Sequence, residues 1–396
     1  MRRVLKFFSK ERVILSVYVL VSIIIGLQHY LGGPGKHNNF IIFRQSLVHL
    51  LDHKNLYVGY PAEYFDIFLY HPTFCILFSP FSILPLPVAI LLWLITCALI
   101  LFYAIRILPV SYDNKVFFWW FILIELVTSL HGQQTNPIIA ALGLLTFSFL
   151  EKDKQKWAAI FPIIAFCIKG YGLIFAALFV FYPKRGQYIL YSVLWLIVFA
   201  FLPLPFLGKD YFIEVYNDWL TCLVDDHKVN FGFSIMGLFK VWWPAFTDID
   251  VSKVQYAGLG LFALTWLLNL IRGTFQSKDH RLLLLAYASL WVIMFNHAAE
   301  SPTYVIAVQG VVLFYLVNQY AYQPWSKILI ILVFLFTMLA PTDIYPLSWR
   351  IGFFQPNLIK VIPCFLVWIV LQVQLLSLKR TTTSSLTNDQ YRTSLL

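Results

Sequence analysis

Residues 296–304 hold two side chains that a simple turn between helices would not need. Asn, Ser and Pro favour such a turn for conformational reasons, but His297 and Glu300 do not. An imidazole can contact a phosphate or an acceptor, and a carboxylate can hold that ring or remove a proton from a hydroxyl. We therefore predict that His297 and Glu300 face a site above the membrane; the alternative is a solvated turn.

A second polar stretch, residues 32–71, contains two further candidate bases, Asp52 and Asp66. Within it, residues 39–51 carry an apolar stripe with helical spacing, which predicts an amphipathic helix on the membrane surface. An acid-bearing stretch between this helix and the next apolar run could form the roof of a cavity. Asp52 would equally suit a surface charge on the helix, and an ordinary interfacial helix is the alternative for the segment.

Among the cations outside the predicted cytoplasmic loops, four are candidates to donate hydrogen bonds to a phosphate. They are Arg44, Lys209, Lys228 and Arg350. Arg350 is preferred because interfacial aromatic residues surround it, although snorkelling at the membrane surface explains many such cations.

Glu125 and Lys169 are charged residues inside apolar runs. Charges within a membrane are costly, so they are either functional or paired. They could pair with each other and hold two helices together. In a transporter, the same two residues would couple ion and substrate movement.

Membrane helices must position all of these residues. Of the chain's residues, 60% are hydrophobic and 12% are charged, whereas a soluble domain is roughly half apolar and a quarter charged. Apolar runs recur along the chain, each near the ~20 residues that a helix needs to cross a bilayer. The runs lack the alternation of barrel strands. The sequence therefore predicts an all-α, polytopic transmembrane protein.

Basic residues predict how the helices are oriented. They cluster before the first apolar run, at residues 2–12, and after the last, at residues 379–380, so the positive-inside rule places both termini in the cytoplasm. Counting each run once gives about twelve helices, within a range of 10 to 13, the first being an uncleaved signal anchor. Termini on the same side require an even number of crossings. A break near Lys169 and Gly170, combined with a re-entrant segment at residues 72–84, also gives an even number.

The predicted organisation is a single transmembrane domain over residues 1–380. It has a first external loop at residues 32–71 and a central external loop at residues 207–254. Residues 381–396 form a polar, Ser/Thr-rich tail that we expect to be cytoplasmic and disordered.

Several function classes lack their signals. The net charge of +10 falls mostly between apolar runs, so it indicates topology rather than binding of nucleic acid. No phosphate-binding loop, dinucleotide motif or metal-ligand spacing is present. We predict no cofactor and no metal.

Three stretches in the first half of the chain resemble glycosyltransferase family 87 of the GT-C superfamily, which includes polyprenyl-phosphate-mannose-dependent mannosyltransferases. They are residues 39–57 with Tyr70-His71-Pro72-Thr73-Phe74 and Ser79-Pro80-Phe81, the Gln134-Thr135-Asn136 motif, and Ile168-Lys169-Gly170-Tyr171. The resemblance implies a GT-C-like fold. Arg44, His71, Lys169, Arg350, Gln134 and Asn136 are then the candidate substrate-binding residues.

The chain departs from this family at Asn39, which aligns with the position where members usually carry the catalytic acid. An amide cannot remove the proton of the acceptor hydroxyl. Asp66, Glu300, His297 and Asp52 are therefore the candidate catalytic residues, with Asn39 marking the family position.

The resemblance predicts transfer of a hexose, such as mannose, from a polyprenyl-phosphate-linked donor to a lipid or glycan acceptor at the outer face. Membrane lipids would be the surrounding partners, and nucleic acid would not be one. A lipid or solute transporter and a non-catalytic relative of the glycosyltransferases are the alternatives. We expect the protein in a prokaryotic inner membrane.

Overall fold

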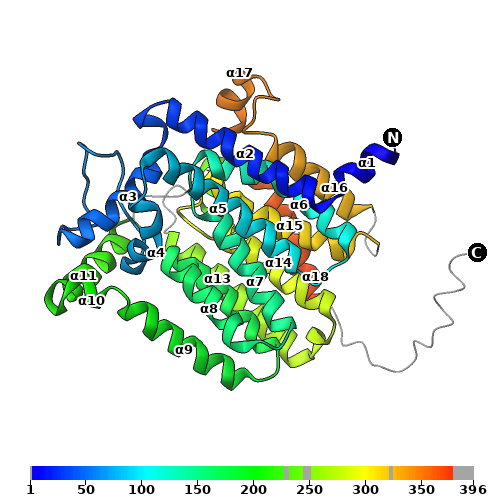
Figure 1. The fold of residues 1–396 in the computed structure, drawn as a ribbon. Helices are drawn as coiled ribbons and strands as arrows, with labels where there is room; N and C mark the ends of the chain where they lie inside the picture. Colours follow the sequence, from blue (N-terminus) through cyan, green and yellow to red (C-terminus); the bar gives the residue numbers. More distant parts are fainter. Residues whose placement is uncertain (1, 227–231, 244–250, 321–323, 378–396) are drawn as a thin grey trace, which may run out of the picture.

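The computed structural model describes residues 2–226, 232–243, 251–320 and 324–377. Every regular element in these ranges is a helix (Figure 1). Lys228, one of the four candidate phosphate ligands, and the predicted tail at residues 381–396 lie outside the described residues.

The first half of the chain forms helices that begin and end as follows: α1 (Arg2–Phe8), α2 (Glu11–Leu31), η1 (Pro34–Lys36), α3 (Asn38–Leu51), α4 (Pro72–Ser82), α5 (Leu86–Ile107), α6 (Tyr112–His131), α7 (Asn136–Glu151), α8 (Gln155–Ile168), η2 (Gly170–Phe181) and α9 (Arg185–Phe201). The second half forms α10 (Leu204–Leu207), α11 (Lys209–Asp226), α12 (Ile235–Trp242), α13 (Val251–Arg272), η4 (Thr274–Gln276), α14 (Lys278–Met294), η5 (Ser301–Thr303), α15 (Tyr304–Asn318), α16 (Trp325–Leu332), η6 (Val333–Met338), α17 (Leu347–Trp349), η7 (Arg350–Phe354) and α18 (Val361–Ser377).

Five helical stretches in the described part of the chain are long and apolar enough to cross a membrane. They are α2, α5, α9 continued through α10, α13, and η5 continued into α15. Six shorter apolar helical stretches accompany them. The prediction of a helical membrane protein is confirmed, whereas the number of crossings stays a prediction.

One end of the bundle is held together by ion pairs that involve basic residues. Arg106 at the end of α5 binds Glu11 at the start of α2, with an N–O distance of 2.8 Å. Arg281 in the first turn of α14 binds Glu151 at the end of α7, with an N–O distance of 2.6 Å. We call this end of the bundle the basic end.

The opposite end gathers the other termini of the same helices. The Nε2 atom of His29, near the end of α2, lies 3.2 Å from the Nδ1 atom of His131 at the end of α6. Trp93 in the first half of α5 donates to the backbone oxygen of Gln133, which follows α6. Helix α11, from the predicted central loop, also lies here, because its Tyr211 hydroxyl donates to the backbone oxygen of Lys54. We call this end the cavity end.

The apolar run that contains Lys169 forms two helices rather than one. Helix α8 ends at Ile168, and Lys169 adopts an extended conformation before η2 begins at Gly170. The two helices are antiparallel, because the start of α8 meets the residues after η2: the Gln155 side-chain amide donates to the backbone oxygen of Pro183. Gly172 permits the close approach: a Cβ added there would lie 2.6 Å from the Cβ of Ala165. Of the two arrangements considered from the sequence, the structure has the broken helix, and its turn lies at the cavity end.

Helix α4 remains at the cavity end and does not run through the bundle. The predicted interfacial helix, α3, packs on it through a buried stripe that includes Phe40, Phe43 and Leu50. Arg44 of α3 donates to the backbone oxygen of Leu84, just beyond the last residue of α4. The expected helix at residues 39–51 is therefore confirmed, but its apolar face is covered by protein.

Glu125 does not pair with Lys169. Its carboxylate accepts two hydrogen bonds from the Lys360 ammonium, at 2.8 and 3.0 Å, and both side chains are buried. The expectation of a Glu125–Lys169 pair is wrong, because Lys169 turns toward the cavity end while Lys360, from just before α18, reaches Glu125 in the middle of α6. A buried charge needs a partner of this kind, and the pair ties α6 to the C-terminal part of the chain.

Candidate active site

A cavity of about 950 Å³ opens at the cavity end of the bundle. Its walls come from α3, the segment before α4, the Lys169 turn, α13, the end of α14 and the segment that follows α14. This volume is in the range of pockets that hold small-molecule ligands. The site therefore combines segments that are widely separated in the sequence.

Polar side chains from three segments form a hydrogen-bonded chain at one side of this cavity. The Gln134 amide donates to the Glu300 carboxylate at 2.6 Å, and the Asn136 amide donates to the Gln134 side-chain oxygen at 2.8 Å. Lys169 donates to the side-chain oxygens of Gln134 and Asn136, at 3.3 and 3.1 Å. Two of its three N–H groups are thereby used, so the ammonium keeps one for a ligand.

Local backbone features place these residues. Gln133 adopts a left-handed conformation with φ of 47°, which turns the chain sharply between α6 and α7. Pro137 in the first turn then starts α7, so that Asn136 stands at its N-terminal end. Lys169 occupies the break between α8 and η2, and Glu300 directly precedes η5. The polar chain thus consists of residues at helix ends.

Asp66 stands apart from this chain and lines the same cavity. Its φ of 98° is unusual for a residue with a side chain. One carboxylate oxygen accepts a hydrogen bond from the backbone N–H of Ile67 at 2.8 Å. Among the described residues the exposed carboxylate has no other hydrogen-bond partner. Backbone strain of this kind is often retained at functional sites.

Tyr70 lies near both carboxylates of the cavity. Burial raises the pKa of its hydroxyl, and the negative charges of Glu300 and Asp66 act in the same direction. Tyr70 therefore stays protonated and can donate a hydrogen bond. Its ring also lies under Lys169, whose ammonium is 5.9 Å from the ring centre.

Asn39 lines the cavity, and its amide nitrogen donates to the backbone oxygen of Gly132 at 2.8 Å. This bond joins α3 to the segment that carries Gln134. An aspartate at this position would place a negative oxygen against the carbonyl unless it were protonated. The amide is therefore suited to a hydrogen bond that joins two walls of the site.

One wall of the cavity is apolar and exposed. It includes Leu173 of η2 and Tyr256 and Leu259 of α13, whose exposed fractions are 42%, 72% and 49%. Trp291 of α14 and Phe295, which directly follows α14, stack beside it, with ring centres 5.5 Å apart. Because α13 is long and apolar enough to cross a membrane, this wall suits a ligand with a hydrocarbon chain.

The other predicted site residues divide into two groups. His297 lines the cavity, and its Nδ1 lies 3.2 Å from the Gln255 amide. Five of the predicted residues that the structure describes do not line it. Arg44 donates to the backbone oxygen of Leu84, Asp52 pairs with Lys54, and Arg350 pairs with Asp343 at 2.6 Å. Lys209 is the first residue of α11. The fifth, His71, is described next.

His71 caps the start of α4. Its Nδ1 accepts a hydrogen bond from the Thr73 backbone N–H, and its ring lies against Tyr216 and Trp219. Burial lowers the pKa of His71 to about 4, so the ring is neutral at physiological pH. Its contacts are those of a structural residue.

Tyr70 and Gln255 are polar residues of the cavity that were not among the sequence-based candidates. Tyr70 directly precedes the His71-Pro72 pair that begins α4. Gln255 is a polar residue at the edge of an apolar run, which is the signal that would have identified it.

A comparison with protein families supports the resemblance noted in the sequence. The model of glycosyltransferase family 87 matches residues 68–341, which is more than half of the chain. This segment includes Gln134, Lys169 and Glu300, whereas Asn39 and Asp66 precede it. No curated protein matches the chain. The family match is sufficient to assign this helical membrane protein: it belongs to glycosyltransferase family 87 and is a glycosyltransferase.

Proposed function

We propose that this glycosyltransferase moves a hexose, such as mannose, from a polyprenyl-phosphate carrier to an acceptor hydroxyl at the extracytoplasmic face. The observation that carries the proposal is a single cavity with a polar cluster around Lys169, an unpaired carboxylate at Asp66 and an exposed apolar wall on η2 and α13. A lipid-linked sugar needs these three environments together.

The donor would enter along the apolar wall. Its isoprenoid chain would lie against Leu173 and Leu259, where burial of apolar surface contributes roughly 25 cal/mol per Å². Its phosphate would then accept a hydrogen bond from the remaining N–H of Lys169, and the positive charge would stabilise the negative charge that develops on the leaving group. Gln134 and Asn136 hold Lys169 in place for this contact.

Asp66 would act as the general base. Its carboxylate takes the proton of the acceptor hydroxyl as the acceptor oxygen forms a bond to the anomeric carbon. The bond between that carbon and the phosphate oxygen breaks, and polyprenyl phosphate leaves with the electron pair. Asp66 is preferred because the Glu300 carboxylate already accepts a short hydrogen bond from the Gln134 side chain. In the described part of the chain, the Asp66 carboxylate accepts a hydrogen bond only from a backbone N–H.

Glu300 and His297 would act on the donor side of the cavity. The Glu300 charge attracts Lys169 and positions Gln134. His297 would contact the phosphate or the acceptor, as its place on the cavity wall permits. A positioned base typically contributes 10²–10⁴-fold to the rate, so loss of Asp66 should cost more than loss of either of these residues.

The proposal includes a membrane arrangement. In a GT-C-like fold of about twelve helices, with both termini in the cytoplasm, the basic end faces the cytoplasm and the cavity faces outward. The clustering of Arg106, Lys184, Arg185 and Arg281 at one end of the bundle favours this orientation. The inner membrane of a prokaryote would be the location, and the acceptor would be a lipid or glycan of the cell envelope.

The test is transfer of radiolabelled sugar by the purified protein in liposomes. Defined polyprenyl-phosphate hexoses serve as donors, and a membrane glycolipid extract supplies acceptors. We expect transfer by the wild-type protein and a loss of about 10²–10⁴-fold in kcat for Asp66→Asn. Asp52→Asn is the matched control. It is the same substitution in the same predicted loop, but Asp52 does not line the cavity.

Glu300→Gln separates charge from hydrogen bonding. The new amide can still accept the bond from Gln134 but no longer attracts Lys169, so the KM for the donor should rise more than kcat falls. If Glu300→Gln abolishes turnover while Asp66→Asn retains it, Glu300 is the base and the assignment of Asp66 is wrong. If a folded wild-type protein transfers no sugar from any donor, the polyprenyl-phosphate proposal fails.

A further inference from the structure

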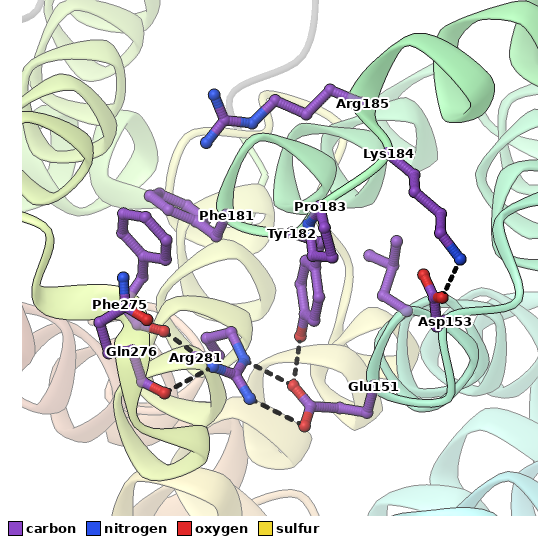
Figure 2. A pocket seen from close by; sticks show the side chains of 11 residues that line it. Glu151, Asp153, Phe181, Tyr182, Pro183, Lys184, Arg185, Phe275, Gln276 and Arg281 are labelled. Carbon is purple, nitrogen blue, oxygen red and sulfur yellow. Dashed lines mark hydrogen bonds and ion pairs between the residues drawn. The ribbon is translucent and has the colours of Figure 1, made fainter.

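A second pocket, of about 590 Å³, lies at the basic end of the bundle (Figure 2). It is formed by the ends of α7 and η2, the start of α9, and the segment between α13 and α14. None of its lining residues lines the cavity described above. The sugar-transfer proposal assigns it no role.

The floor of this pocket is a closed network of hydrogen bonds. Arg281 binds both carboxylate oxygens of Glu151, at 2.6 and 3.0 Å, and also donates to the backbone oxygens of Phe275 and Gln276. The Tyr182 hydroxyl donates to the same carboxylate at 2.6 Å. Arg281 and Glu151 therefore neutralise each other, and neither is free to bind a charged ligand.

The rim of the pocket carries a second ion pair and one additional cation. Lys184 pairs with Asp153. Arg185 makes no ion pair or side-chain hydrogen bond with any residue that the structure describes, and it is exposed. In Figure 2 its side chain extends toward the side of the pocket that holds the rings of Phe181 and Phe275, away from Asp153. The three basic and two acidic lining residues leave one positive charge, and that charge is on Arg185.

The pocket lies beside a helix that a bilayer would surround. Helix α9 begins at Arg185, and its apolar stretch is the least buried of the five that are long enough to cross a membrane. In Figure 1 it lies along one edge of the bundle. A ligand in the pocket would therefore meet an unpaired guanidinium, two aromatic rings and hydrocarbon within a short distance.

We infer that this pocket binds the phosphate headgroup of an anionic phospholipid from the leaflet at the basic end. The guanidinium of Arg185 donates to the phosphate oxygens, for which its fork of N–H groups is well suited. The rings of Phe181 and Phe275 contact the glycerol and the first part of the acyl chains. Basic pockets between membrane helices are known to bind anionic headgroups.

The inference can be tested on the purified, full-length protein by native mass spectrometry. The probes are dioleoyl phosphatidylglycerol, dioleoyl phosphatidylcholine and inorganic phosphate, titrated separately. We expect tighter binding of the anionic lipid than of the zwitterionic one, and about fivefold weaker binding of the anionic lipid by Arg185→Ala, as for loss of one cation near a membrane surface. Arg185→Lys should restore part of the affinity.

Arg12→Ala is the matched control, because Arg12 is an exposed arginine at the same end that does not line the pocket. Its affinity for the anionic lipid should equal that of the wild type. Equal weakening by Arg185→Ala and Arg12→Ala would mean nonspecific charge attraction and would overturn the inference. Inorganic phosphate that displaces the lipid at similar concentration would identify a site for a free anion instead. Both readouts are independent of sugar transfer.

Discussion

Asn39 lines the cavity and joins two of its walls. Its amide bonds to the Gly132 carbonyl and thereby joins α3 to the segment of Gln134. Asp66 and Glu300 supply the carboxylates of the same cavity. Under the proposed function, the proton-accepting and wall-joining roles are therefore carried by different residues in this chain.

We expect Asn39→Asp to weaken the protein rather than to improve it. The substitution introduces the acid that the sequence resemblance predicts at this position, but it leaves the Gly132 carbonyl without a donor and facing a negative charge. The free energy of unfolding should fall by about 1–3 kcal/mol, the usual cost of an unsatisfied polar group, and sugar transfer should not increase. Thermal unfolding in detergent and the transfer assay measure both effects. Asn217→Asp, on the exposed surface of α11, is the control; a more active Asn39→Asp protein would contradict this account.

His71 should make the stability of the protein depend on pH. Its pKa is about 4 when folded and about 6.5 when unfolded, so at pH 5 only the unfolded chain binds the proton. The contribution of neutral His71 to the free energy of unfolding is then fully present above about pH 6.5. It decreases as the pH falls toward 4, and the loss is about 2 kcal/mol at pH 5. His71→Asn, which can still cap α4, should lose less stability between pH 7 and pH 5 than the wild type. Equal losses in thermal unfolding experiments would show that His71 is not the group responsible.

Single residues of the site were predictable from different signals. Lys169 is a charge in an apolar run, His297 and Glu300 are not needed by a turn, and Gln134 belongs to the motif that resembles the family; all four line one cavity. Arg350 was selected as an external cation among aromatic residues but pairs with Asp343. A sequence of polar residues does not reveal which charges neutralise each other, because the partners come together only in the fold.

At the scale of elements, the hairpin of α8 and η2 determines where Lys169 lies. A continuous helix over residues 155–182 would carry Lys169 into the middle of the bundle. The break places it at the cavity end, beside Gln134 and Asn136. The short apolar run at residues 72–84 and the longer one that contains Lys169 could not be assigned from hydropathy alone, since hydropathy does not distinguish one long helix from a short hairpin.

Two glycines in the hairpin should respond differently to the same substitution. A Cβ at Gly172 would lie 2.6 Å from the Ala165 Cβ and 2.8 Å from its carbonyl carbon, whereas nothing lies within 4 Å of a Cβ at Gly170. Gly172→Ala should therefore force α8 and η2 apart, cost about 1–3 kcal/mol of stability and displace Lys169. We expect reduced thermal stability and a raised KM for the donor. Gly170→Ala is the matched control, and equal effects of the two substitutions would argue against close packing at Gly172.

At the scale of the whole molecule, composition was enough to predict a helical membrane protein, but not how its distant parts meet. Lys360 reaches Glu125 across 235 positions of the chain, and Arg281 reaches Glu151 across 130. Apolar periodicity contains no information about such pairs. Charge distribution does contain information about orientation, because the two ends of the bundle differ in their basic residues.

The orientation can be tested with cysteines at opposite ends of the bundle. In a Cys222→Ser background, where the other four cysteines are buried, Asn217→Cys reports the cavity end and Lys278→Cys the basic end. A membrane-impermeant maleimide added to intact cells should label position 217, and position 278 only after permeabilisation, because the positive-inside rule retains the basic end in the cytoplasm. The reverse pattern would place the cavity in the cytoplasm. Soluble sugar donors would then have access to Asp66, and the outward-facing part of the proposed reaction would have to be abandoned.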